Sequence, residues 1–228
     1  MEKCKFLGVI INKNLDWKDQ IDNVISQVSK SCGTIYSVRK RIPDKILRTV
    51  YLALIQPYLM YCIPLWGANF QSDLMQKLFI LQKKCLRIVG NKTEKINGKF
   101  CHTKQIFKKL NIMNVFNLYN YVTACEAMKI VTSGIPISLY NYYKISEKSK
   151  RFILPKTRLS SVQKRSFVYK SKKILNYLSV NDITYYDLSV NTFKNRLRKH
   201  LLYLQSKSLI GDDSWLPCNP DLFFDVKL

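Results

Sequence analysis

The sequence has little of what catalytic and metal sites are usually built from. Its 228 residues contain 15 Asp and Glu against 38 Lys and Arg, and only two histidines, His102 and His200. The histidines lie far apart in the sequence, and no serine-centred nucleophile motif stands near either of them. The seven cysteines are spread singly without a Cys-x-x-Cys pair, and Cys101 beside His102 matches no zinc-site spacing. We therefore expect no catalytic residue, no metal ion and no cofactor in this chain.

The few carboxylates also have simpler interpretations than metal binding. Asp16, Asp19 and Asp22 follow at i, i+3 and i+6 where a helix is expected to begin, and negative charge there suits the helix dipole. Gly211-Asp212-Asp213 has the form of a polymerase carboxylate pair. However, it stands in a polar turn, without the third carboxylate and the hydrophobic hairpin that two-metal chemistry needs. Helix capping and a polar turn are the favoured interpretations.

Charge is missing altogether between Arg48 and Asp73, a stretch long enough to span a bilayer. Gln56, Pro57 and Pro64 near its middle, with three tyrosines, raise the cost of membrane insertion. We therefore expect a buried helix with a proline kink and no membrane partner. A membrane-associated protein built around residues 49–70 is the alternative.

Cysteine usage and the first residues bear on the compartment. The seven cysteines are an odd number and most lie in apolar segments, which favours free, mostly buried thiols in a reducing environment. The opening Met-Glu-Lys has no basic-then-apolar leader. We expect an intracellular protein of the cytoplasm or the nucleus.

The surplus of basic residues is the most informative property of the sequence. The formal net charge of +23 predicts a polyanionic partner. Basic residues gather from Lys77 to Lys109 and from Lys144 to Lys173, and aromatic residues lie in or beside the second run. Such residues supply salt-sensitive phosphate contacts and base stacking. A solvated face that keeps the protein in solution is the alternative. Because no base-reading motif is present, we expect recognition by shape and charge.

The apolar spacing predicts a mainly α fold: a helical bundle with a short N-terminal strand and a C-terminal helical segment. A strand is expected over residues 5–11 with a turn at 12–14. The expected helices run from Trp17 to the basic residues 39–41, from Pro43, from Ser72, from Thr103 to Leu110, from Asn114 to Ser133, from Phe167 to Leu178, and from Ser189 through Leu201. We divide the chain into 1–14, a helical domain at 15–135, a basic irregular linker at 136–165, C-terminal helices at 166–210 and an acidic tail at 211–228.

Several segments resemble the C-terminal part of reverse transcriptases from non-LTR (LINE-type) retrotransposons, especially the jockey and CR1-like groups. They are KFLGVI (5–10) with LDWK (15–18), LIQPYLMY (54–61) with LWG (65–67), LQKKCLRI (81–88), HT (102–103) before IF (106–107), and TFKNRL (192–197). They follow the family's order and together cover most of residues 3–203.

The resemblance implies a non-catalytic fragment of an RNA-directed DNA polymerase from a transposable element. In that family the catalytic carboxylates, including an aromatic-x-Asp-Asp pair, and the endonuclease lie upstream, so Mg²⁺ would belong to the missing palm. Residues 1–14 would be the edge of the palm, in which Phe6, Leu7 and Gly8 match the primer grip. Residues 15–135 would be the thumb, which clamps the primer–template duplex.

The expected function is binding of primer–template or RNA through the backbone, without sequence specificity. The upstream palm, where present, would be a second partner. We expect the phosphate contacts from six basic residues, Arg39, Lys40, Arg41, Lys77, Lys84 and Arg87. The alternative is a truncated remnant without function that exposes apolar surface.

Overall fold

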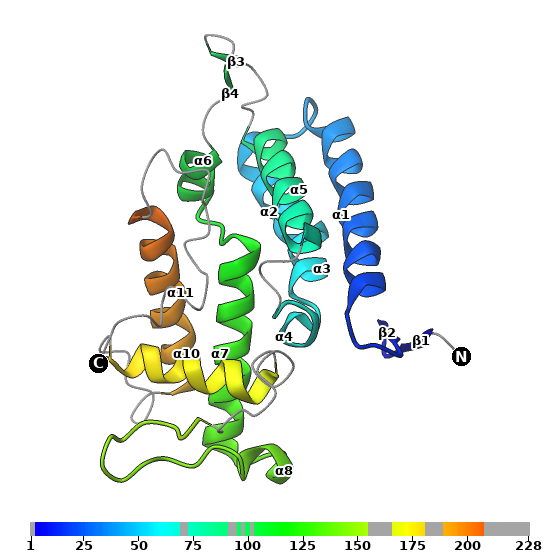
Figure 1. Cartoon of the computed structure of the whole chain (residues 1–228). Coiled ribbons are helices and arrows are strands. Elements are labelled where there is room, and N and C mark those ends of the chain that lie inside the picture. Colours follow the sequence, from blue (N-terminus) through cyan, green and yellow to red (C-terminus); the bar gives the residue numbers. More distant parts are fainter. Residues whose placement is uncertain are drawn as a thin grey trace. The chain divides into compact units, whose positions relative to one another are not determined.

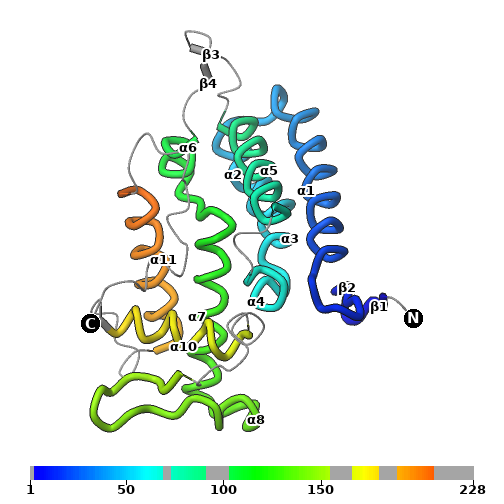
Figure 2. Tube along the Cα trace, in the orientation of Figure 1, coloured from blue at the N-terminus to red at the C-terminus, as the bar shows by residue number. Residues whose placement is uncertain are grey.

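The computed structural model describes residues 3–68, 73–90, 95–96, 99–100, 103–154, 166–180 and 189–207. The chain forms two compact units, unit 1 (Met1–Val115) and unit 2 (Phe116–Leu228). As the sequence predicts, it is mainly helical with a short N-terminal sheet (Figures 1 and 2). The five-part division of the chain stays a prediction. The Ser72 cap, His102 and Gly211-Asp212-Asp213 lie outside the described residues.

The first residues of unit 1 form a β-hairpin. Strands β1 (Lys3–Phe6) and β2 (Val9–Asn12) pair antiparallel, with Phe6 opposite Val9. Leu7 and Gly8 make the two-residue turn, with φ of 45° and 83°, the positive values that a type I′ hairpin turn requires. The single strand expected over residues 5–11 is therefore wrong. The sequence obscured the turn because leucine seldom occupies a left-handed position.

Hydrogen bonds join the hairpin to the start of helix α1 (Lys18–Val38). The Gln20 side-chain oxygen accepts from the Ile10 backbone N–H at 2.9 Å. Asp16 accepts from the Lys18 backbone N–H at 2.9 Å and from the Asn12 amide at 2.6 Å. These hydrogen bonds hold the pKa of the Asp16 carboxyl below its usual value. Trp17 and not Asp16 is the N-cap residue of α1, and the Asp16 carboxylate accepts from the first helical N–H from one position further upstream.

The uncharged stretch forms three helices rather than one kinked helix. They are α2 (Asp44–Leu54), α3 (Gln56–Met60) and α4 (Ile63–Trp66). Pro57 and Pro64 stand in the first turns of α3 and α4. Proline fits a first turn but breaks a helix interior, so each proline starts a new helix. No helix among the described residues is long and apolar enough to cross a membrane.

Helix α5 (Asp73–Val89) forms the centre of unit 1 and packs against α1, α2 and α6 (Thr103–Leu110). Cys32 of α1 and Cys85 of α5 are both buried. Their hydrogen bond lowers the pKa of the Cys32 thiol and raises that of the Cys85 thiol. Between α5 and α6, β3 (Lys95–Ile96) pairs with β4 (Lys99–Phe100).

Gln82 of α5 is a fully buried polar side chain in this core. Its amide nitrogen donates to the Tyr51 hydroxyl and to the Met113 carbonyl, each at 3.0 Å. Its side-chain oxygen accepts from the Val115 backbone N–H at 2.9 Å. One side chain therefore ties α5 to α2 and to the segment that leads into α7 (Val115–Ser133).

Unit 2 contains most of α7, the short α8 (Ile137–Tyr140), α10 (Phe167–Val180) and α11 (Val190–Lys207). The Asn117 amide of α7 donates to Gln205 of α11 at 3.0 Å. Ser189 accepts from the Thr192 backbone N–H at 3.3 Å, the N-cap that the sequence predicts.

Part of the segment expected to be an irregular linker packs within unit 2. The buried Tyr143 hydroxyl lies 2.6 Å from the Ser171 hydroxyl of α10. The Asn176 side chain accepts from the backbone N–H of Phe152 and donates to its carbonyl. These contacts hold Tyr143 and Phe152 against α10.

Candidate nucleic-acid interface

Several helix ends meet at one end of unit 1. Helix α1 ends just before Arg39, and α2 begins at Asp44 after a short turn. The first turn of α2 lines a common cavity with the last residues of α5 and α6. Figures 1 and 2 show α1 and α5 side by side, both ending at this end. We call it the basic end and define it by Arg39, Lys40, Arg41, Lys45, Arg48, Lys84, Arg87, Lys108 and Lys109.

Three of the predicted phosphate contacts lie in the turn between α1 and α2. Lys40 and Arg41 are exposed, and Arg39 is half-buried. The Arg39 guanidinium lies 4.3 Å from the centre of the Tyr36 ring, which orients it through a cation–π contact. The turn therefore presents three successive cations to solvent.

The other three predicted contacts share one face of α5. At 100° per residue, Lys84 lies within about 20° of Lys77 around the helix, and Arg87 lies about 60° further. Lys77 and Lys84 are exposed and Arg87 is half-buried. Arg87 belongs to the basic end. Lys77 lies about 15 Å from Arg87 along the helix axis.

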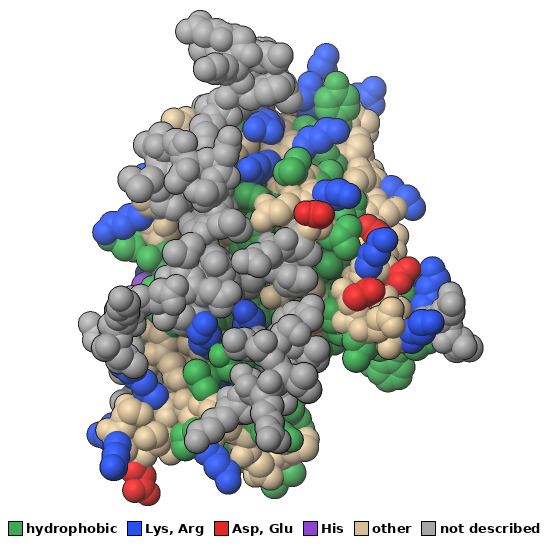
Figure 3. All heavy atoms as spheres, viewed as in Figure 1, with side chains coloured by type: hydrophobic (Ala, Val, Ile, Leu, Met, Phe, Trp, Pro, Cys, Tyr) green, Lys and Arg blue, Asp and Glu red, His purple; other side chains and the backbone are tan. Residues whose placement is uncertain are grey.

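The acidic residues of α1 lie at the other end of that helix. Asp16, Asp19 and Asp22 surround its first turn. Along the helix axis, Asp19 lies about 30 Å and Asp22 about 26 Å from Arg39. On the face shown in Figure 3, Lys and Arg side chains lie over the upper ends of α1, α2 and α5, and acidic side chains lie nearer the start of α1. Unit 1 is therefore electrostatically asymmetric along α1.

The structure does not bring Phe6, Leu7 and Gly8 to the basic end. They form the end of the hairpin beside the start of α1, where Phe6 is 64% and Leu7 74% exposed. The Tyr61 hydroxyl donates to the Leu7 carbonyl, and its ring lies against Gly8. The nine predicted binding residues therefore fall into two separate groups, one at the hairpin and one along α5 and at the basic end.

Sequence reasoning missed Lys45 and Arg48 as members of the basic group. Lys45 and Arg48 belong to α2, whereas the predicted basic cluster runs from Lys77 to Lys109. One signal was present, because the first turn of α2 follows Arg39–Arg41 after a proline. Lys45 and Arg48 lie close to Lys109 only because α2 packs near the end of α6, and residue spacing along the sequence does not predict this packing.

Within the described ranges, no three His, Cys, Asp or Glu side chains lie close enough together to hold a metal ion. No protein-family model, curated protein or solved structure matches this chain.

Proposed function

We propose that this chain binds RNA or an RNA–DNA duplex through the phosphate backbone, as a non-catalytic, thumb-like part of a non-LTR reverse transcriptase. The observation that supports this function best is the group of cations at the basic end. Among the described residues, Lys40, Arg41, Lys45, Lys84 and Lys109 have no carboxylate within 4.0 Å. Cations without carboxylate partners are available for phosphates.

Backbone binding also fits the lack of a base-reading element. Lys and Arg contacts to phosphates release condensed counterions, and this release gives affinity without sequence preference. The basic end collects such residues from four helix ends, and Lys77 extends the cationic surface along α5. We therefore infer that the bound nucleic acid lies with its phosphate backbone along this cationic surface.

The hairpin supplies a second contact in this proposal. It lies about 31 Å from the basic end, the length of α1. At 3.4 Å per base pair, that length corresponds to about nine base pairs of duplex. Leu7 is exposed at positive φ, an arrangement that costs stability and suits a segment used in contact with a partner. Where an upstream palm is present, the hairpin would form its edge.

The face of α5 provides a direct test. We expect K77E/K84E/R87E to weaken binding to unrelated RNA–DNA duplexes by a common factor and to reduce the salt slope by about 2 to 3. Fluorescence anisotropy over a salt series measures both quantities. The matched control K30E/K144E/K148E reverses three exposed lysines that lie outside the basic end, the α5 face and the hairpin. It should cost far less affinity.

An equal loss of affinity in both triple variants would contradict this surface assignment. It would mean that the duplex is attracted only by the total positive charge of the protein.

The competing proposal is a remnant without function. It is favoured by five exposed apolar or aromatic side chains, Phe6, Leu7, Tyr58, Tyr61 and Leu65. That proposal gains if the wild-type protein binds no nucleic acid, unfolds over a broad temperature range and binds a dye for apolar surface.

A further inference from the structure

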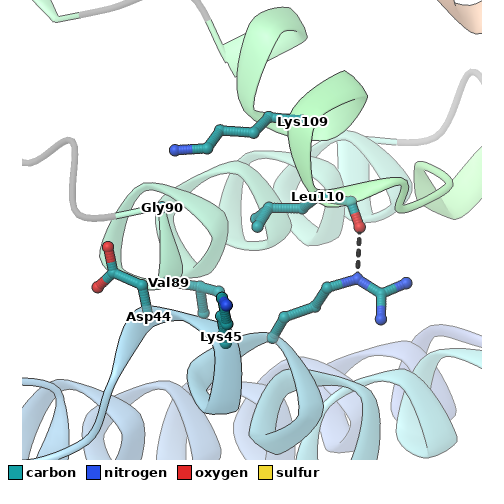
Figure 4. A pocket seen from close by; sticks show the side chains of 7 residues that line it. Asp44, Lys45, Val89, Gly90, Lys109 and Leu110 are labelled. Carbon is teal, nitrogen blue, oxygen red and sulfur yellow. Dashed lines mark hydrogen bonds between the residues drawn. The ribbon is translucent and has the colours of Figure 1, made fainter.

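A cavity of about 360 Å³ opens at the basic end. Asp44, Lys45 and Arg48 line it from the first turns of α2, Gly90 from the residue after α5, and Lys109 and Leu110 from the end of α6 (Figure 4). Its volume lies in the lower part of the range for small-molecule sites. It is large enough for a phosphate and part of the attached sugar.

The charges around the cavity favour an anion. Three cationic side chains line it against the single carboxylate of Asp44. In the part of the chain that the structure describes, Asp44 forms no ion pair within 4.0 Å with Lys45, Arg48 or Lys109. Asp44 therefore does not neutralise these three cations by a close ion pair, and their charge is available to a bound phosphate. The start of α2 adds one positive helix end, whereas the ends of α5 and α6 are negative, so the anion preference comes from the three side chains and not from the helix dipoles.

Arg48 is already held in place for such a ligand. Its Nε donates to the Leu110 carbonyl at 2.6 Å, shown by the dashed line in Figure 4. That bond uses one of the five N–H donors of the guanidinium. An anchored guanidinium loses less conformational freedom when it binds, and its planar fork matches the oxygens of a phosphate.

Gly90 allows the three helices to come this close. A Cβ atom at residue 90 would lie 2.8 Å from Cγ2 of Ile106 in α6, closer than carbon atoms normally approach. With glycine there, the end of α5 packs directly on α6, which places Lys109 opposite the first turn of α2. The cavity is thus built by packing within unit 1.

We propose that this cavity binds one backbone phosphate of a nucleic-acid strand and fixes the position of that strand at the basic end. The proposal rests on the proposed nucleic-acid binding and adds to it a defined site formed by Lys45, Arg48 and Lys109. The turn with Lys40 and Arg41 leads directly into α2, so neighbouring phosphates would meet further cations.

The test compares two charge-matched double variants of the full chain in binding to a mixed-sequence RNA–DNA duplex. K45Q/K109Q removes two cations of the cavity, and K30Q/K148Q removes two exposed lysines outside the basic end and the hairpin. We expect K45Q/K109Q to weaken binding by about 10-fold or more near 0.1 M salt and to reduce the salt slope by up to about 2. The control should stay within about 3-fold of wild type. Equal losses in the two variants would overturn the proposal.

Inorganic phosphate is the second probe, because the same chemistry could serve a free anion. In NMR titrations at constant ionic strength, phosphate should shift the Gly90 and Leu110 amide signals saturably in wild type and not in K45Q/K109Q. If the duplex does not bind to wild type but phosphate does, the proposed function fails and the cavity holds a free anion instead. If neither binds, the cavity is not a phosphate site.

All four substituted lysines are exposed, so both double variants should keep the wild-type unfolding temperature. Thermal unfolding followed by circular dichroism checks this.

Discussion

At the scale of single residues, Gln82 shows how a polar side chain can organise an apolar core. All three of its hydrogen bonds are buried, and they involve Tyr51, Met113 and Val115. The side chain of leucine has a similar size but no hydrogen-bonding group, so it would leave these partners unpaired. A buried unsatisfied polar group costs about 1–3 kcal/mol.

We therefore expect Q82L to lower the free energy of unfolding by about 2–4 kcal/mol. Urea unfolding followed by circular dichroism measures the change. The control Q27L alters a half-buried glutamine of α1 and should stay within about 0.5 kcal/mol of wild type. A stability of Q82L equal to that of the control would show that the three hydrogen bonds contribute no net stability.

The sequence predicted only part of the buried face of α5. On a helical wheel, one apolar side of α5 is expected from Leu74, Leu78, Leu81, Cys85 and Ile88. Leu78, Cys85 and Ile88 are buried as this predicts, whereas Leu74 and Leu81 are only half-buried. Met75, Phe79, Gln82, Leu86 and Val89 are buried although the expected apolar side left them out. The reason is that α5 contacts α1, α2 and α6. A helix between three neighbours buries a wider arc than the single stripe that periodicity detects.

At the scale of secondary-structure elements, the turn of the β1–β2 hairpin has a strained backbone conformation. This turn contains Leu7 and Gly8, two of the predicted binding residues. Leu7 has a φ of 45° and is 74% exposed, so its conformation costs stability and its side chain gains little from packing. Gly8 adopts a φ of 83° without that cost. The two positions should therefore respond to substitution in opposite directions.

We expect L7N to slow hydrogen exchange of the β1 and β2 amides about 5-fold, because asparagine tolerates the left-handed region and Asn-Gly is a favoured type I′ pair. G8A should accelerate the same exchange by about the same factor, equivalent to about 1 kcal/mol. The control I46N makes the same change from apolar to polar at a half-exposed position of α2 and should leave the hairpin unaffected. Faster exchange in L7N would contradict the turn conformation.

The helices were more predictable than the connections between them. Apolar spacing and caps located α1, α6, α7, α10 and α11 to within a few residues, since each combines a local start signal with an apolar face. For the stretch between Arg48 and Asp73, the prediction of one kinked helix is wrong. Its prolines indicate breaks, but whether the chain kinks or begins a new helix depends on packing around each proline.

At the scale of the whole molecule, composition predicted a polyanionic partner but not where that partner would bind. The net charge of +23 belongs to the full sequence, whereas the asymmetry of unit 1 arises because α1 and α5 end together (Figure 1). Periodicity identifies helices but does not predict which helix ends meet. The separation of the hairpin from the basic end likewise follows from the length and direction of α1.

The wild-type protein itself offers the most direct test of the central claim. The measurement is the affinity for several RNA–DNA duplexes of unrelated sequence between about 50 and 300 mM KCl. Six phosphate contacts predict a linear fall of log affinity with log salt, with a slope near −5 for every sequence. Binding that is insensitive to salt, or that differs strongly between sequences, would contradict recognition through the backbone.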